Sequence, residues 1–218
     1  MKALLISASP HKEESKTFLL AKEVMRGLTD TGIQTETIHL SDWQISFCRH
    51  CEECHKKILR CSVKDSVAGI LKKMLESDGI ILASPNYINQ VTASLKALFD
   101  RSAHFIHCQR LLGKYIVGVV TSGSGDDAEV VNYIRYYAHT CGAQYSGGVS
   151  SAGYAVKEKI LEAYQLGKKL AQDMKEKTLF AGQLKIIELG KKHFQRVIES
   201  RKDQWQEEYV YWQKQGWL

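Results

Sequence analysis

Residues 79–83 read Gly-Ile-Ile-Leu-Ala, a run that contains no polar side chain. Two further runs have much the same character, Lys-Ala-Leu-Leu-Ile-Ser at residues 2–7 and Tyr-Ile-Val-Gly-Val-Val at residues 115–120. Short apolar runs without regular alternation are typical of strands buried on both faces of a parallel sheet. Residues 34–40 (QTETIHL) do alternate, which indicates a strand nearer the edge of that sheet.

Amphipathic stretches separate these strands and continue after them. They cover residues 16–30, 65–77, 92–103, 126–140 and 156–176. Strands that alternate with helices form parallel neighbours joined by right-handed crossovers. The sequence therefore predicts an α/β protein, a three-layer α/β/α sandwich around a five-stranded parallel sheet of order 2-1-3-4-5.

The α/β alternation stops near residue 176. Residues 1–176 are predicted to form one domain with a cysteine-rich loop at 46–64, and residues 177–218 a helical extension with a helix over 183–213. One face of that helix carries a stripe, made of Ile187, Phe194, Ile198, Trp205, Tyr209 and Trp212. The stripe must be covered by its own domain or by another subunit. We expect the second, and hence a homo-oligomer (dimer or tetramer), because five helices already cover the sheet.

Composition narrows the class of protein. Among 218 residues, 44% are hydrophobic and 25% are charged, which is typical of a soluble globular chain. No stretch is long and apolar enough to span a membrane, and the apolar start is too short for a signal peptide, so we expect a cytoplasmic protein with no membrane partner. The net charge of +6 is too diffuse to indicate nucleic-acid binding.

A ligand crevice is predicted where the strand order reverses, at the carboxyl ends of the first and third strands. The only two prolines, Pro10 and Pro85, follow those strands. The first loop, residues 7–17 (SASPHKEESKT), contains neither G-x-G-x-x-G nor a P-loop motif. Its hydroxyls on Ser9, Ser15 and Thr17, with Lys16, could bind a phosphate at a helix N-terminus, although Ser15 could instead simply cap the helix.

Four of the six cysteines lie in one short segment with the spacing C-x2-C-x2-C-x6-C. They are Cys48, Cys51, Cys54 and Cys61. This spacing is typical of an iron-sulfur cluster. His50 and His55 keep a mixed zinc site open, and a cluster of thiols with no metal is the third alternative.

Three loops together resemble the flavodoxin-like family of NADPH-dependent FMN reductases. They read SPHKEESKT after the first strand, SPNYINQVTASLKALFDR after the third and TSGSG after the fourth. The resemblance implies that Ser9, His11, Ser15, Lys16 and Thr17 hold the FMN phosphate. It also implies that Pro85, Asn86, Tyr87 and Ile88 lie along the isoalloxazine ring, with Thr121, Ser122, Gly123 and Gly125 on its other side. One departure is that Glu13 and Glu14 precede Ser15, where carboxylates would repel a phosphate unless they point outward.

The cysteine segment resembles the motif of the iron-sulfur flavoproteins, a branch of the same family. The resemblance implies that Cys48, Cys51, Cys54 and Cys61 ligate a 4Fe-4S cluster in an oligomeric protein. We expect an FMN-dependent oxidoreductase that relays electrons from a ferredoxin-like or NAD(P)H donor through FMN and the cluster. The alternatives are an NAD(P)H-dependent flavin, quinone or nitro-compound reductase without a cluster, and a redox or metal sensor. Basic residues around the cysteines could dock an acidic ferredoxin-like donor; they are Arg49, Lys56, Lys57, Arg60 and Lys64.

Overall fold

A five-stranded parallel sheet of order β2-β1-β3-β4-β5 forms the centre of the protein, as predicted. The computed structural model describes residues 1–218. The strands are β1 (Lys2–Ser7), β2 (Gln34–His39), β3 (Gly79–Pro85), β4 (Tyr115–Ser122) and β5 (Gln144–Ala152). The sequence of β5, QYSGGVSSA, has no apolar run, which is why its position was not predicted.

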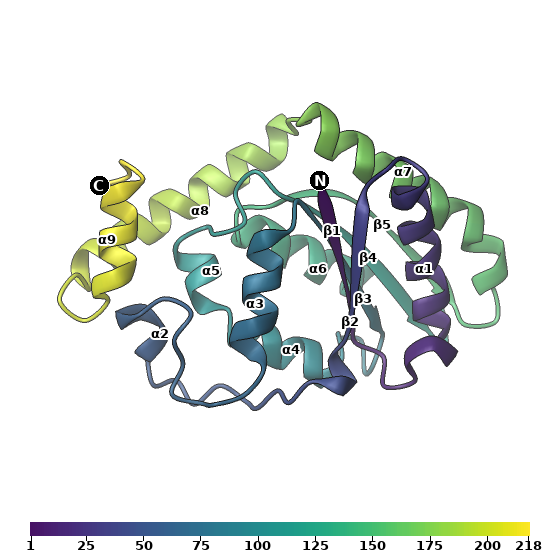
Figure 1. Cartoon of the computed structure of the whole chain (residues 1–218), viewed down its shortest axis with the longest axis horizontal. Coiled ribbons are helices and arrows are strands. Elements are labelled where there is room, and N and C mark those ends of the chain that lie inside the picture. Colours follow the sequence, from purple (N-terminus) through teal and green to yellow (C-terminus); the bar gives the residue numbers. More distant parts are fainter.

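Helices cover both faces of the sheet (Figure 1). One face carries α1 (Lys16–Thr29) and α7 (Ile160–Glu176), and the other carries α3 (Val67–Glu76), α4 (Ala93–Asp100) and α6 (Ala128–Thr140). Successive strand residues feed two separate cores: Leu4 and Ile6 pack on one face, Leu5 on the other. The apolar runs of β1, β3 and β4 are therefore buried on both faces, as predicted.

Short elements interrupt several predicted helices and loops. Residues 92–103 form α4 and, after a break, the separate helix α5 (Ala103–His107). The first loop contains the 3-10 turn η1 (Lys12–Glu14), and η2 (Leu40–Asp42) follows β2. The cysteine-rich loop contains the short helix α2 (Glu53–Lys56), and η3 (Val156–Lys159) leads into α7. None of the helices is long and apolar enough to cross a membrane.

The C-terminal extension contains two helices, so the prediction of one helix over 183–213 was wrong. Helix α8 (Ala181–Ser200) leaves the sandwich, the chain turns over residues 201–205, and α9 (Gln206–Lys214) stands beside α2 (Figure 1). The turn reverses the chain and brings α9 against the cysteine-rich loop.

The apolar stripe of the extension is covered within the chain, which corrects the expectation that another subunit covers it. Ile198, Trp205 and Trp212 form a small buried core with Cys108, next to α5. Phe194 and Tyr209 are half-buried against the same core, and Ile187 is buried. The chain covers its own stripe because the turn at 201–205 folds α9 back. The homo-oligomer therefore stays a prediction that the stripe no longer supports. Sedimentation analysis tests it.

Candidate functional site

Loops from three strands meet at the carboxyl edge of the sheet. The hydroxyls of Thr17, at the start of α1, and Thr121, near the end of β4, lie 2.6 Å apart and are buried. The backbone N–H of Asn86, directly after β3, donates to the carbonyl oxygen of Thr121 at 2.7 Å. The structure thus brings the predicted residues of the three loops together around the end of β4.

The first loop is held by its own hydroxyls. Ser15 caps α1, because its Oγ accepts from the N–H groups of Thr17 at 3.1 Å and Phe18 at 3.4 Å. Ser9 is buried, and its Oγ accepts from the N–H of His11 at 3.3 Å. The capping interpretation of Ser15 is therefore correct. Since capping uses the oxygen only as an acceptor, the Ser15 O–H remains a donor.

The two carboxylates of the first loop point away from the start of α1. The side chain of Glu13 is 70% exposed and its Oε1 lies 3.2 Å from Nε2 of His39 on β2. Glu14 is exposed as well. The long side chain of Lys16 instead lies against the backbone at Gly153, where an added Cβ would come within 3.3 Å of Nζ. The positive charge next to the Ser15 cap of α1 is therefore the ammonium group of Lys16.

The loop after β3 ends in a strained hairpin. Tyr87 and Gln90 pair through two backbone hydrogen bonds of 2.9 and 3.2 Å, and Ile88 and Asn89 between them have φ of 49° and 55°. Isoleucine is 97% exposed at this tip. A β-branched residue in the left-handed region costs about 1–2 kcal/mol. Strain of this kind, together with an exposed apolar side chain, is typical of a functional site.

The loop after β4 is open, and unpaired acceptors lie on it and on the loop after β3. Gly125 has φ of 92° and its N–H donates to Ser122 Oγ at 2.7 Å, while a Cβ on Gly123 would meet no neighbour. Two buried oxygen atoms here have no partner, Asn86 Oδ1 and Asp127 Oδ2. Because unpaired buried polar atoms are costly, this edge of the sheet fits a ligand with polar groups.

The cysteine-rich loop spreads its thiols along an irregular backbone. Cys48 and Cys51 are exposed, and Cys54 and Cys61 are half-buried. The side chains that the structure already gathers closely enough to share one metal ion are His55, His107 and Glu208, whose ligand atoms lie within 4.8 Å of one another.

The thiol of Cys51 has a hydrogen-bond partner within the same loop. Its Sγ lies 3.0 Å from Ser62 Oγ. The hydrogen bond with Ser62, followed by one with the backbone of Glu53, lowers the pKa of the Cys51 thiol. A lowered pKa favours the thiolate, which is the form that binds metal.

A buried ion pair fastens the two ends of the cysteine-rich loop. Arg101 donates to both carboxylate oxygens of Asp65, at 2.8 and 3.1 Å, and also to the carbonyl oxygen of Ser46 at 2.8 Å. The backbone N–H of Ser46 donates to Asp65 at 2.9 Å. Sequence analysis missed this pair, because nothing near Asp65 indicates a partner in a helix that begins beyond the next strand.

A small cavity lies behind the cysteines. Cys54, Cys61, Arg101 and His104 contribute to its lining, with apolar side chains that include Leu71. His104 is buried and neither of its ring nitrogens has a partner. Burial lowers the pKa of His104 to about 3. His104 is therefore an unpaired polar group beside two predicted ligands, which sequence analysis did not identify.

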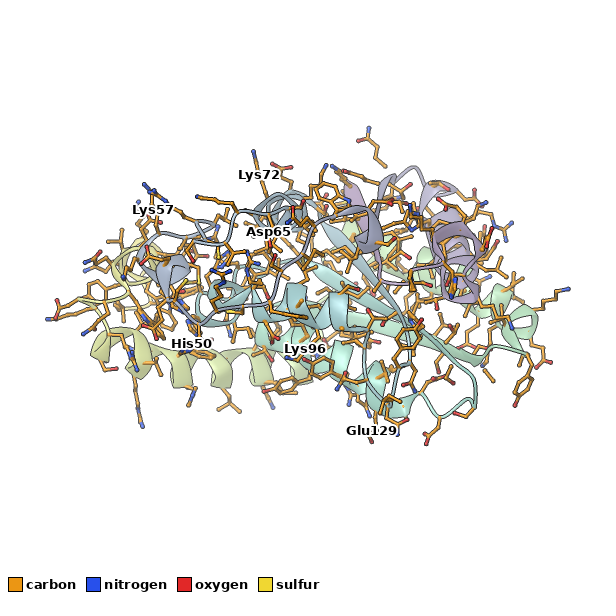
Figure 2. All side chains as sticks on the ribbon, turned by 90° about the horizontal axis from the view of Figure 1, so that it is seen from below. His50, Lys57, Asp65, Lys72, Lys96 and Glu129 are labelled. Atoms are coloured by element: carbon orange, nitrogen blue, oxygen red, sulfur yellow. The ribbon has the colours of Figure 1, made fainter.

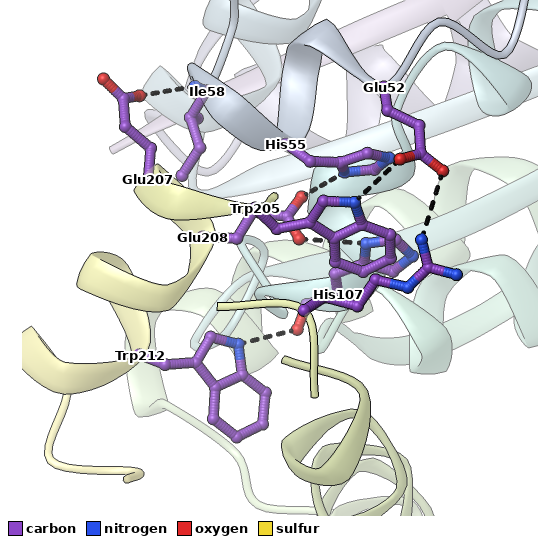
Figure 3. Close-up of polar contacts among 9 residues, drawn as sticks. Glu52, His55, Ile58, His107, Trp205, Glu207, Glu208 and Trp212 are labelled. Carbon is purple, nitrogen blue, oxygen red and sulfur yellow. Dashed lines mark hydrogen bonds and ion pairs between the residues drawn. The ribbon is translucent and has the colours of Figure 1, made fainter. Parts of the chain in front are cut away.

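Helix α9 holds the cysteine-rich loop through Glu208 (Figure 3). The fully buried carboxylate of Glu208 pairs with Nδ1 of His55 at 2.7 Å and Nδ1 of His107 at 3.1 Å. Trp205 stacks on both imidazoles. Burial alone would lower the pKa of His55, but hydrogen bonds with Cys54 and Glu208 outweigh it and raise the pKa to about 10. A charged His55 thus links α9 to Cys54.

Further contacts tie the extension to the same loop. Glu207 accepts from the N–H of Ile58 at 2.6 Å, and Trp205 Nε1 donates to Glu52 at 3.3 Å. The basic residues of the loop remain on its outside, and Figure 2 shows Lys57 at the edge of the molecule. The C-terminal extension therefore supports the cysteine-rich loop and leaves its basic surface free.

Known proteins match the chain in both sequence and fold. The profile of the NADPH-dependent FMN reductase family matches residues 1–156. An iron-sulfur flavoprotein of Archaeoglobus fulgidus is 29% identical over 229 residues, which covers the whole of both chains. An iron-sulfur flavoprotein of Methanocaldococcus jannaschii is 46% identical over 102 residues, 47% of this chain and 52% of the relative.

Solved structures with the same fold include flavin enzymes. A flavone reductase has a TM-score of 0.66 at 20% identity and covers 80% of this chain and 63% of its own. An NADH:FMN oxidoreductase has a TM-score of 0.59 at 20% identity, with 84% and 92% covered. The chain belongs to the NADPH-dependent FMN reductase family, in its iron-sulfur flavoprotein branch, and is a flavin-dependent oxidoreductase.

Proposed function

We propose that the protein relays electrons between a ferredoxin-like or NAD(P)H donor and an acceptor, with FMN and a 4Fe-4S cluster as its redox groups. The observation that carries the proposal is the C-x2-C-x2-C-x6-C loop, fastened at both ends and supported by α9, on a chain of an FMN reductase family. FMN exchanges a hydride, electron pairs or single electrons, and a cluster passes one electron at a time.

The edge of the sheet supplies groups that suit FMN. The hydroxyls of Ser15 and Thr17 and the ammonium of Lys16 would hold the phosphate at the start of α1. The unpaired Asn86 Oδ1 offers an acceptor to a polar ring edge, and the backbone at Gly123 is open to close approach. The exposed Ile88 would gain an apolar contact.

The cysteine-rich loop supplies groups that suit a cluster. Cys48, Cys51, Cys54 and Cys61 would be its ligands. Arg101 lies within hydrogen-bonding reach of Cys61, and His55 of Cys54. The exposed basic residues of the loop, such as Lys57 and Arg60, suit an acidic donor protein.

Anaerobic purification followed by analysis of FMN, iron, acid-labile sulfide and zinc tests this function. We expect one FMN, with four iron and four sulfide, per chain. FMN with neither iron nor zinc, or with zinc in place of iron, would replace the proposal by a flavin reductase without a cluster. Mixing with a reduced ferredoxin or with NADPH then identifies the donor class by the rate of flavin reduction.

Replacing both Ser15 and Thr17 with alanine is expected to weaken FMN binding at least tenfold. Each hydroxyl would lose a hydrogen bond to a charged group, worth about 1.5–3 kcal/mol. The dissociation constant is measured by flavin fluorescence. Ser15→Asp is the matched variant, because aspartate also caps a helix but adds a negative charge. The Ser15→Asp variant should be as stable as the parent protein, but it should bind FMN more weakly because its carboxylate repels the phosphate. Unchanged affinity in both variants would place the phosphate elsewhere.

Replacing Ile88 with asparagine is expected to stabilise the FMN-free protein by about 1 kcal/mol and to weaken FMN binding. Asparagine tolerates the left-handed region far better than isoleucine, so the strain at the hairpin tip is relieved. Denaturation of the FMN-free protein and flavin titration measure the two effects. Leu161→Asn, at another exposed apolar position, serves as the control and should leave FMN affinity unchanged. A variant that binds FMN as tightly as the parent would remove Ile88 from the site.

A further inference from the structure

His104 differs from the other histidines that pack beside it. His55 and His107 both pair with Glu208, at 2.7 and 3.1 Å. His104, on α5 with only 1% of its surface exposed, has no partner at either ring nitrogen. Its ring meets the edge of Phe105 instead, which satisfies neither nitrogen.

An unpaired imidazole in this place is costly. A neutral imidazole carries one N–H donor and one acceptor nitrogen. A buried donor without a partner destabilises the folded protein, whereas leucine would fill the space without an unpaired polar group. The unpaired imidazole therefore indicates that an acceptor meets it in the functional protein.

The surroundings limit what that acceptor is. His104 lines the cavity with Cys54 and Cys61, with four aliphatic side chains that include Leu59, and with Arg60 and Arg101. The guanidinium of Arg101 is a donor, already used by Asp65 and Ser46. The cavity volume is about 10 Å³, too small for an organic ligand. Among the other side chains that line the cavity, those with a hydrogen-bond acceptor are Cys54 and Cys61, through their sulfur atoms.

We propose, on the basis of the proposed function, that His104 donates its imidazole N–H to a sulfur atom of the cluster, either a cysteine thiolate or an inorganic sulfide. A hydrogen bond to sulfur stabilises the reduced cluster, which is the more negative form, and so raises its reduction potential. His104 is then a residue that tunes the electron relay, although it ligates no iron.

The test compares the cluster potential of three variants of the whole, cluster-loaded protein. EPR-monitored redox titration measures the potential. We expect His104→Leu to shift the equilibrium about tenfold toward the oxidised cluster, which is 59 mV for one electron. His104→Asn keeps a donor and should shift less. His139→Gln is the control. His139, on α6, is also buried, but its ring pairs with Gln183 of α8 at 3.0 Å. This variant should leave the cluster potential unchanged.

Pulsed EPR of the reduced cluster gives a second reading. In wild-type protein labelled with 15N-histidine we expect a 15N coupling that persists in the His55→Asn variant. Its absence overturns the proposal even if the His104 variants do not retain the cluster. An unshifted potential in His104→Leu overturns only this inference. A wild-type protein that contains no iron and sulfide overturns the proposed function and this inference together.

Discussion

Replacing Cys51 with serine is expected to remove the bound iron and sulfide while FMN stays bound. A cluster needs all four thiolates, and the hydrogen bond with Ser62 and the lowered thiol pKa prepare Cys51 for the thiolate state. The FMN loops follow β1, β3 and β4, so they do not depend on this side chain. Iron analysis and the flavin absorbance of the purified variant measure both outcomes.

Two control variants separate ligand loss from general damage. Cys141→Ala changes a buried cysteine at the end of α6, outside the cysteine-rich loop, and should keep both iron and FMN. Ser62→Ala removes the hydrogen bond from Cys51 but leaves all four sulfurs, so iron should remain. Full iron occupancy in Cys51→Ser would falsify the ligand assignment.

The sheet could be predicted where its strands are locally distinctive. The runs in β1, β3 and β4 are apolar because helices cover both faces, so the signal lies in each segment itself. In β5, by contrast, the buried positions include the polar residues Gln144, Ser146 and Ser151, which only the tertiary packing against α6 and α7 reveals. The three loops that we propose for FMN could be located in the sequence because each directly follows a strand.

The C-terminal extension could not be predicted from its periodicity. Ile198, Trp205 and Tyr209 keep a helical spacing across residues 201–205, so the pattern conceals the turn. The same turn carries Glu208 to His55, a pair separated by 153 residues. Periodicity identifies which side chains are buried, but it does not identify the surface that covers them.

The buried pair of Asp65 and Arg101 is the other feature that sequence could not reveal, and its loss should cost the most stability. Asp65→Ala is expected to lower the free energy of unfolding by about 3–5 kcal/mol, because the buried Arg101 guanidinium would have no counter-charge. Both ends of the cysteine-rich loop would also be released, since Ser46 contacts both side chains. Urea denaturation at neutral pH measures the loss, and limited proteolysis of residues 46–64 measures the release.

The pH dependence of the unfolding free energy tests this pair. Burial alone would raise the pKa of Asp65, but hydrogen bonds from Arg101 and from the backbone N–H groups of Ser46 and Val67 outweigh it and lower the pKa. A lowered pKa stabilises the fold above the unfolded value of about 3.9, and this contribution is lost as the pH falls through the folded value. The difference in the free energy of unfolding between the wild type and Asp65→Ala should therefore become smaller below about pH 4. Asp100→Ala, which breaks the half-exposed pair with Lys96, should cost under about 1 kcal/mol. If Asp65→Ala lowers the free energy of unfolding by no more than Asp100→Ala does, the pair of Asp65 and Arg101 does not hold the cysteine-rich loop.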